Sequence, residues 1–134
     1  MASIFTKIIE GSIPSETIAE TESEISFLDI NPCAEGHTLV VPKREVERFE
    51  DLDAEDAVSL MRFMVRIAGA VTNCFGGIDY NVILNNGVLA GQEVMHVHFH
   101  IIPRSERSPR MFANRKSMSP EELREIGDRI RNCL

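Results

Sequence analysis

Apolar residues recur at helical spacing along one long segment of this chain. After Asp53 they return every three or four residues, which predicts a long helix that buries a methionine-rich face. Asp53 is the expected N-cap, because a carboxylate there accepts from unpaired backbone N–H groups, and Gly76 and Gly77 are expected to end the helix. The predicted buried positions are Ala57, Met61, Met64, Val65, Ala68 and Val71.

Two further helical segments are predicted near the ends of the chain. Ser119 precedes Pro120, and Glu122 follows three residues after the serine. This order supplies an N-cap, a proline at the first helical position and the acidic residue of a capping box, so a helix is expected from there to about Arg131. A short helical turn is expected over residues 3–10.

Five shorter runs, rich in β-branched and aromatic residues, are predicted as strands. They span residues 17–21, 24–29, 37–42, 79–85 and 94–103. Short connections between the first three runs favour antiparallel hairpins, and the long helix falls between the third and fourth runs. The pattern therefore predicts an α+β fold built on a five-stranded sheet.

The composition favours a single domain that covers residues 1–134. Hydrophobic residues make up 43% of the chain and charged residues 26%, which is close to the average of globular domains. There is no internal repeat, and no linker rich in proline, glycine or serine divides the sequence. These values argue against a disordered, collagen-like or disulfide-dense protein.

Charge and cysteine content narrow the choice of partner and compartment. Lys and Arg number 14 and Asp and Glu number 21, so the formal net charge is −7. This charge disfavours nucleic acid, although a local cluster of donors can still bind a small phosphorylated ligand. Cys33, Cys74 and Cys133 form no C-x-x-C pair, so we expect reduced thiols in a cytoplasmic protein. No apolar stretch reaches the roughly 20 residues of a membrane helix, so no membrane partner is expected.

The histidines are concentrated in one place. Three of the four histidines in the chain, His96, His98 and His100, lie in a stretch of five residues inside the last predicted strand. Side chains alternate along a strand, so these imidazoles share one face and the intervening apolar residues form the core face. The preceding segment, from Asn85 to Gln92, combines glycines with amide side chains and is expected to hold a phosphate.

Two chemistries use alternating histidines of this kind. The imidazoles can converge on a divalent metal, with a carboxylate such as Glu93 completing the site. Alternatively, one neutral imidazole attacks an electrophile while its neighbours orient it, hold the substrate or protonate the leaving group. Histidine suits the second role because its ordinary pKa of about 6.5 leaves it largely neutral near pH 7. Spacing alone leaves both chemistries open.

The histidine segment resembles a known family. HVHFHII, residues 96–102, matches the His-φ-His-φ-His-φ-φ signature of the histidine triad nucleotide hydrolases, where φ is apolar. AGQEVMHVHFHIIPR, EGHTLVVPKREVERFEDL, IFTKIIEGSIPSE and FLDINP are also similar to family segments, so the resemblance covers about residues 3–104. It implies a homodimer whose two sheets join into one ten-stranded sheet.

The resemblance also implies catalytic roles. His98 corresponds to the nucleophile that attacks the α-phosphorus of a nucleotide and forms a nucleotidyl-histidine intermediate, which water then hydrolyses. The family holds the far ring nitrogen of this residue with a backbone carbonyl, expected here at His100. The His100 side chain would meet phosphate or leaving-group oxygens. His96 and His37 match a pair of histidines that buttress the site.

Further residues match the nucleotide-binding positions of the family. Asn85 and Gln92 correspond to hydrogen-bonding residues near the transferred phosphate, and Asp29 to the carboxylate that binds the ribose hydroxyls. Glu93 stands where one branch has a serine or threonine that touches phosphate, and an ionised carboxylate has no proton to donate. The apolar slot for a purine is implied at Phe5, Ile8, Phe27 and Ile30.

The sequence thus predicts an enzyme that cleaves purine nucleoside phosphoramidates, of the adenosine 5′-monophosphoramidase type, with an AMP-like substrate and no cofactor. Some relatives have a zinc site built from N-terminal cysteines and histidines, but no cysteine precedes Cys33, so no metal is expected. The alternatives are a dinucleoside polyphosphate hydrolase, a nucleotide-binding sensor with little turnover, and a metal-dependent hydrolase.

Overall fold

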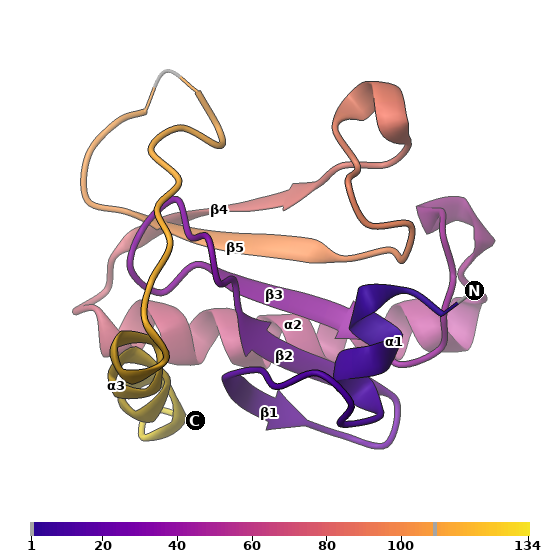
Figure 1. The fold of residues 1–134 in the computed structure, drawn as a ribbon, viewed down its shortest axis with the longest axis horizontal. Coiled ribbons are helices and arrows are strands. Elements are labelled where there is room, and N and C mark those ends of the chain that lie inside the picture. The colour runs from indigo at the N-terminus through magenta and orange to yellow at the C-terminus, as the bar shows by residue number, and fades with distance from the viewer. Residues whose placement is uncertain (1, 109) are drawn as a thin grey trace.

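A computed structural model describes residues 2–108 and 110–134. Figure 1 shows a five-stranded sheet with the long helix α2 on one face and the short helix α1 on the other. The strands are β1 (Thr17–Glu20), β2 (Glu24–Leu28), β3 (Thr38–Pro42), β4 (Asp79–Leu84) and β5 (Phe99–Arg104). All neighbours pair antiparallel in the order β1-β2-β3-β5-β4, so the predicted α+β fold is confirmed.

The helices form where their caps predict them. Helix α2 spans Ala54–Cys74, and its N-cap Asp53 accepts from the Asp56 N–H at 2.8 Å. Helix α3 spans Pro120–Arg131 and has the expected capping box between Ser119 and Glu122. Helix α1 spans Ile4–Ile9. Single 3-10 turns, η1 (Phe49–Asp51) and η2 (Val88–Ala90), lie in the loops.

The buried face of α2 differs from the predicted one. Met64, Ala68 and Val71 are buried as expected, but Met61 and Val65 are 42% and 70% exposed. The face that packs on the sheet is centred instead on Leu60, Phe63 and Ile67. Both stripes have helical spacing, and only contact with β2, β3 and β5 decides which of them is buried.

Strand β5 also begins later than predicted. The sequence places its start at Val94, whereas sheet pairing begins at Phe99. The preceding residues run beyond the end of β3, where the Val97 N–H donates to the carbonyl of Val46 at 2.7 Å. His96 and His98 therefore lie in the irregular segment just before the strand, and only His100 is part of the sheet.

Two apolar clusters cover the two faces of the sheet. The larger lies between the sheet and α2 and α3, and includes Val40, Phe99 and Ile101. The smaller lies under α1 and contains Phe5, Ile25, Phe27, Leu39 and Val41. No helix in the described residues is long and apolar enough to cross a membrane. The histidines lie at the edge of the smaller cluster, so one wall of any site there is apolar.

Candidate active site

A cavity of about 750 Å³ opens on the α1 face of the sheet. Most of the residues implied for nucleotide binding line it: Phe5, Ile8, Phe27, Asp29, Ile30, Asn85, Glu93, His98 and His100. Gln92, His37 and His96 do not line it. The wall is largely apolar with a few polar groups, as in most small-molecule sites.

The apolar wall is formed by α1 and β2. The rings of Phe5 and Phe27 meet edge to face with their centres 5.5 Å apart. Phe5 also lies edge-on to His98, at 4.8 Å between ring centres. The residues of the predicted purine slot therefore lie directly beside His98.

His98 is held by one backbone hydrogen bond. Its Nδ1 lies 2.8 Å from the carbonyl oxygen of His96. A carbonyl only accepts, so we assign the ring proton to Nδ1, which leaves a lone pair on Nε2. Burial lowers the pKa of His98 below the ordinary value, and the bond to the His96 carbonyl opposes this shift without cancelling it. The ring is therefore a neutral acceptor at pH 7.

The carbonyl that holds His98 differs from the expected one. The resemblance implied the carbonyl of His100, but the structure uses that of His96, two residues before the ring. His96 precedes the first paired residue of β5, so its carbonyl is not part of the sheet pairing and accepts from the ring instead. The consequence for the ring is the same, because either carbonyl would fix the proton on Nδ1.

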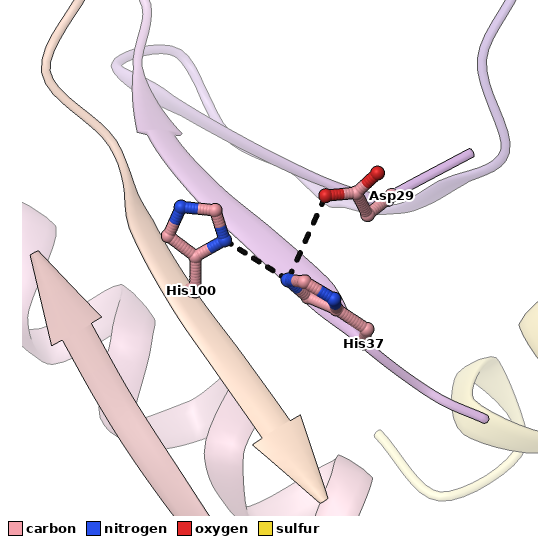
Figure 2. A group of neighbouring side chains, drawn as sticks. All are labelled: Asp29, His37 and His100. Atoms are coloured by element: carbon pink, nitrogen blue, oxygen red, sulfur yellow. Dashed lines mark hydrogen bonds and ion pairs between the residues drawn. The ribbon is translucent and has the colours of Figure 1, made fainter. Parts of the chain in front are cut away.

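His100 is held in the opposite sense, by the His37 ring that lies beside it in Figure 2. The Cys33 N–H donates to Nδ1 of His37 at 3.0 Å, so the proton of His37 is on Nε2. That nitrogen lies 2.9 Å from Nδ1 of His100, which must accept. His100 therefore carries its proton on Nε2, and the nitrogen not used by His37 is a donor.

Burial keeps both of these rings neutral. It lowers the pKa of His37 to about 3, and the neighbouring His100 adds to the effect. Burial likewise lowers the pKa of His100 to about 3. Asp29 Oδ2 lies 3.6 Å from Nε2 of His37, too far for a hydrogen bond, so the His37 proton is directed to His100.

His96 belongs to a separate network. Its Nδ1 lies 2.7 Å from Oγ of Ser3, the N-cap of α1, and its Nε2 lies 2.7 Å from the carbonyl of Pro42. The carbonyl requires the proton on Nε2, so Ser3 donates to Nδ1. His96 therefore fixes α1 against the end of β3, and it has no hydrogen bond to His37.

The loop after β4 is closed by Gln92. Its Oε1 accepts from the Gly87 N–H at 2.7 Å, and its Nε2 donates to the carbonyls of Glu47 and Val94 at 2.9 and 3.0 Å. Gly87 has φ 97°, a conformation that side chains disfavour. The Gln92 amide thus holds the loop, and its side chain does not line the cavity. Asn85 and Glu93 of the same segment do face the cavity.

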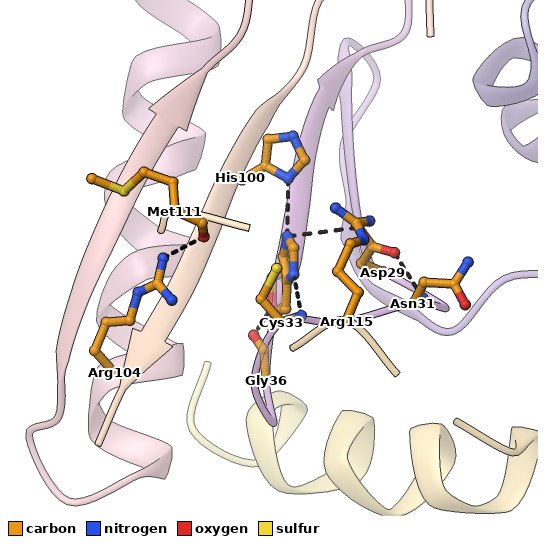
Figure 3. Close-up of polar contacts among 10 residues, drawn as sticks. Asp29, Asn31, Cys33, Gly36, His100, Arg104, Met111 and Arg115 are labelled. Carbon is orange, nitrogen blue, oxygen red and sulfur yellow. Dashed lines mark hydrogen bonds and ion pairs between the residues drawn. The ribbon is translucent and has the colours of Figure 1, made fainter. Parts of the chain in front are cut away.

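Residues 111–118, here called the strap, supply a wall that the sequence did not indicate. Met111, Phe112 and Arg115 line the cavity. Figure 3 shows Arg115 beside Asp29, with Nη2 donating to Oδ2 at 2.9 Å. Phe112 lies edge-on to His100 at 4.9 Å between ring centres. The strap lacks periodicity and any motif, so no local signal in the sequence could have placed it there.

Asp29, His37 and His100 are the group of side chains within the described part of the chain that best approaches a metal-ligand set. Nitrogens bound to one tetrahedral zinc would stand about 3.3 Å apart, given Zn–N bonds of about 2.0–2.1 Å. The two imidazole nitrogens are instead 2.9 Å apart with one proton between them. The arrangement fits a hydrogen-bond chain better than a metal centre.

Comparison with known proteins gives consistent matches. Residues 10–107 match the HIT domain. The chain is 39% identical over 132 residues to an adenosine 5′-monophosphoramidase of Schizosaccharomyces pombe, covering 97% of this chain and 96% of the relative. It is 48% identical over 103 residues to an uncharacterized HIT-like protein of Methanocaldococcus jannaschii, covering 77% and 79% of the two chains. A crystal structure of a HIT-like protein from Bartonella henselae superposes with a TM-score of 0.89 at 36% identity, covering 98% and 96% of the two chains.

Proposed function

This chain belongs to the HIT domain family, and from that membership we propose that it is a nucleotide hydrolase that cleaves phosphoramidates of purine nucleoside monophosphates through a covalent intermediate on His98. The observation that carries the proposal is the pairing of two neutral rings of opposite polarity in one cavity. His98 offers a lone pair and His100 offers an N–H. A phosphorus centre under nucleophilic attack requires both.

In the first step, Nε2 of His98 attacks the α-phosphorus. An N–P bond forms, the P–N bond of the substrate breaks, and the leaving amine takes up a proton from solvent. The proton stays on Nδ1, and the His96 carbonyl that accepts from it stabilises the positive charge that the ring acquires. His98 is therefore the nucleophile and needs no separate base.

In the second step, water attacks the same phosphorus. An O–P bond forms, the bond to Nε2 of His98 breaks, and the monophosphate leaves while a proton passes to solvent. His100 donates a hydrogen bond to phosphate oxygen in both steps, because its Nδ1 is committed to His37. With a pKa of about 3, His100 acts as a neutral donor at pH 7.

The remaining cavity residues suit a nucleoside. The Phe5 and Phe27 rings provide an apolar slot for a base, with Ile8 and Ile30 beside it. Asp29 lies at the same cavity and offers a carboxylate to the ribose. The name of the Schizosaccharomyces pombe relative supports an adenosine monophosphoramidate as the first substrate to test.

The decisive experiment compares the wild-type protein with His98→Ala on adenosine 5′-phosphoramidate. The variant should lose turnover by at least about 10³-fold while its affinity for AMP changes little. Mass spectrometry of wild-type protein that is denatured rapidly at alkaline pH, where a histidine–phosphorus bond survives, should find a nucleotidyl adduct on the peptide that contains His98. Equal loss of binding and turnover, or an adduct on another residue, would contradict the proposal.

The same assay separates the alternatives. Diadenosine polyphosphates should turn over more slowly than the phosphoramidate, and full activity should persist in a chelator. Faster turnover of the dinucleotides would favour a polyphosphate hydrolase. Loss of activity in chelator would indicate a metal-dependent hydrolase, and binding without turnover would indicate a nucleotide sensor.

We further propose a homodimer in the cytoplasm. Apolar side chains of α2 and of the edge strand β4 are exposed on the same side of the sheet: Val58, Met61, Val65, Tyr80 and Val82. A second copy pairing at the free edge of β4 would cover them and extend the sheet to ten strands. The three cysteines are free thiols, which suits a reducing compartment.

Light scattering tests the dimer. Val65→Glu should shift the protein to the monomer mass, because a charge would be buried in the interface. Leu134→Glu places the same charge on an exposed apolar residue at the chain end and should leave the mass unchanged. A monomeric wild-type protein would refute this part of the proposal.

A further inference from the structure

The strap is fastened at both ends. At its start, Nη2 of Arg104 donates to the carbonyl of Met111 at 2.7 Å. At its end, the Lys116 N–H donates to the carbonyl of Pro32 at 3.1 Å. Figure 3 shows the result, in which residues 86 positions apart in sequence face each other: Arg115 of the strap and Asp29 of the loop after β2.

Both oxygens of Asp29 are fixed, but neither is saturated. Oδ1 accepts from the Asn31 N–H at 2.8 Å and Oδ2 accepts from Arg115 at 2.9 Å. Each oxygen of an ionised carboxylate has room for a second donor. The plane of the carboxylate is thereby set, while one acceptor position on each oxygen stays available to a ligand in the cavity.

Arg115 also supplies the charge that this position needs. Asp29 is only 8% exposed, and a buried carboxylate without a cation is costly. The two nearby imidazoles, His37 and His98, are neutral, as the pKa shifts above require. The Arg115 side chain is 35% exposed and reaches the carboxylate from the strap.

We propose that Arg115 is a positioning residue for nucleoside selection, which holds the Asp29 carboxylate so that its two oxygens accept from the vicinal hydroxyls of a ribose. This inference rests on the proposed function, because it takes a ribonucleotide as the occupant of the cavity. The Arg115 guanidinium lies 5.7 Å from the centre of the Phe112 ring, which contacts His100. The strap thus joins the ribose end of the cavity to the catalytic end.

The test compares adenosine 5′-phosphoramidate with its 2′,3′-dideoxy analogue in the wild type, Arg115→Met, Arg115→Lys and Asp29→Asn. Methionine keeps an unbranched chain and removes the guanidinium. Arg115→Met should lower kcat/KM for the ribose substrate about tenfold, mainly through KM, as expected for loss of one charge-assisted contact. Turnover of the dideoxy substrate should stay within about twofold, because that substrate makes no contact with Asp29.

Two further variants define the scale of the effect. Asp29→Asn should abolish most of the preference for the ribose substrate over the dideoxy substrate. The preference that remains in this variant is the lowest value that Arg115→Met can reach. Arg115→Lys should recover at least half of the lost preference on a logarithmic scale, because it restores the charge without the planar fork. Lys116→Ala, which alters an exposed neighbour on the strap, should behave as the wild type.

Three outcomes would overturn the inference. An equal loss on both substrates would make Arg115 a structural residue of the strap. An unchanged preference would remove it from ribose selection, and tighter binding of the ribose substrate would mean that Arg115 blocks Asp29. If the wild type hydrolyses neither substrate, the proposed function fails, and calorimetric affinities for AMP and dideoxy-AMP then test Arg115 on their own.

Discussion

His98 and His100 stand two residues apart and face the same cavity, yet they offer it opposite groups. A backbone carbonyl accepts a hydrogen bond from Nδ1 of His98, so the proton is on that nitrogen and the other nitrogen of the ring accepts. The His37 ring donates to His100 at Nδ1, so its other nitrogen donates. The difference arises from the partner behind each ring, since the residue type and the burial are alike. Two identical side chains thus supply the cavity with one hydrogen-bond acceptor and one donor.

The comparison is tested most severely by removing each ring in turn. His98→Ala should lower kcat by about 10³-fold or more, and His100→Ala by about 10²-fold, because losing the nucleophile costs more than losing one donor. Single-turnover kinetics measure both values. Equal losses would mean that the two rings do not have distinct roles.

A second test changes His37, the residue that donates to His100. His37→Leu removes the donor to Nδ1, so the His100 proton can move to that nitrogen and the cavity loses an N–H. We expect kcat to fall about 10-fold to 100-fold. His37→Gln has a side-chain N–H to donate and should recover part of the loss. Nitrogen NMR of the imidazoles would report the tautomer, and an unchanged His100 tautomer in the leucine variant would contradict this account.

A third prediction concerns the loss of folding stability at acidic pH. The folded pKa values of His37 and His100 are about 3, below the unfolded value of about 6.5, so the unfolded chain binds more protons between these limits. Stability should be fully present above pH 6.5 and should fall as the pH drops, by up to about 1.4 kcal/mol per pH unit for each ring. Urea unfolding of the wild type and of His37→Gln between pH 6.5 and 5 measures the slope. The variant should have the shallower slope, and equal slopes would refute the assignment.

The smallest effect on kcat is expected from a change in the hydrogen-bond network of Ser3 and His96. Ser3→Ala removes the N-cap of α1 and the donor to His96, and should cost about 1 kcal/mol of unfolding free energy. Since His98 is held by the backbone of His96, kcat should change less than about threefold. Ser23→Ala, at an exposed serine in the turn between β1 and β2, is the matched control. A large loss of kcat would show that the side chain of His96 matters to His98 more than its backbone does.

Much of this architecture follows from local patterns. Asp53, Ser119 and the glycines after α2 bound the helices because caps act within one turn. The alternation of His96, His98 and His100 with apolar residues predicted a shared face, and His98 and His100 do line the cavity, although His96 does not and strand β5 begins only at Phe99. The residues predicted to form a purine slot could be named only through resemblance to a family, and Phe5, Ile8, Phe27 and Ile30 do line the cavity.

Other features depend on contacts between distant segments. The Gln92 side chain has an amide that could bind phosphate, but this amide forms hydrogen bonds with the backbones of Gly87, Glu47 and Val94. Met61 and Val65 have helical spacing equal to that of the buried stripe of α2, and only the position of the sheet leaves them exposed. Arg115 gains its place at Asp29 because the strap is fastened by Arg104 and Pro32.

By itself, the sequence determined the helix caps, the strand content and the gathering of imidazoles, because these depend on neighbours within a few residues. The His98 tautomer is also local, because the carbonyl that accepts from its ring lies two residues away at His96. Tertiary structure alone decided which nitrogen of His100 carries the proton and which cation faces Asp29, because the His37 imidazole and the Arg115 guanidinium come from distant segments.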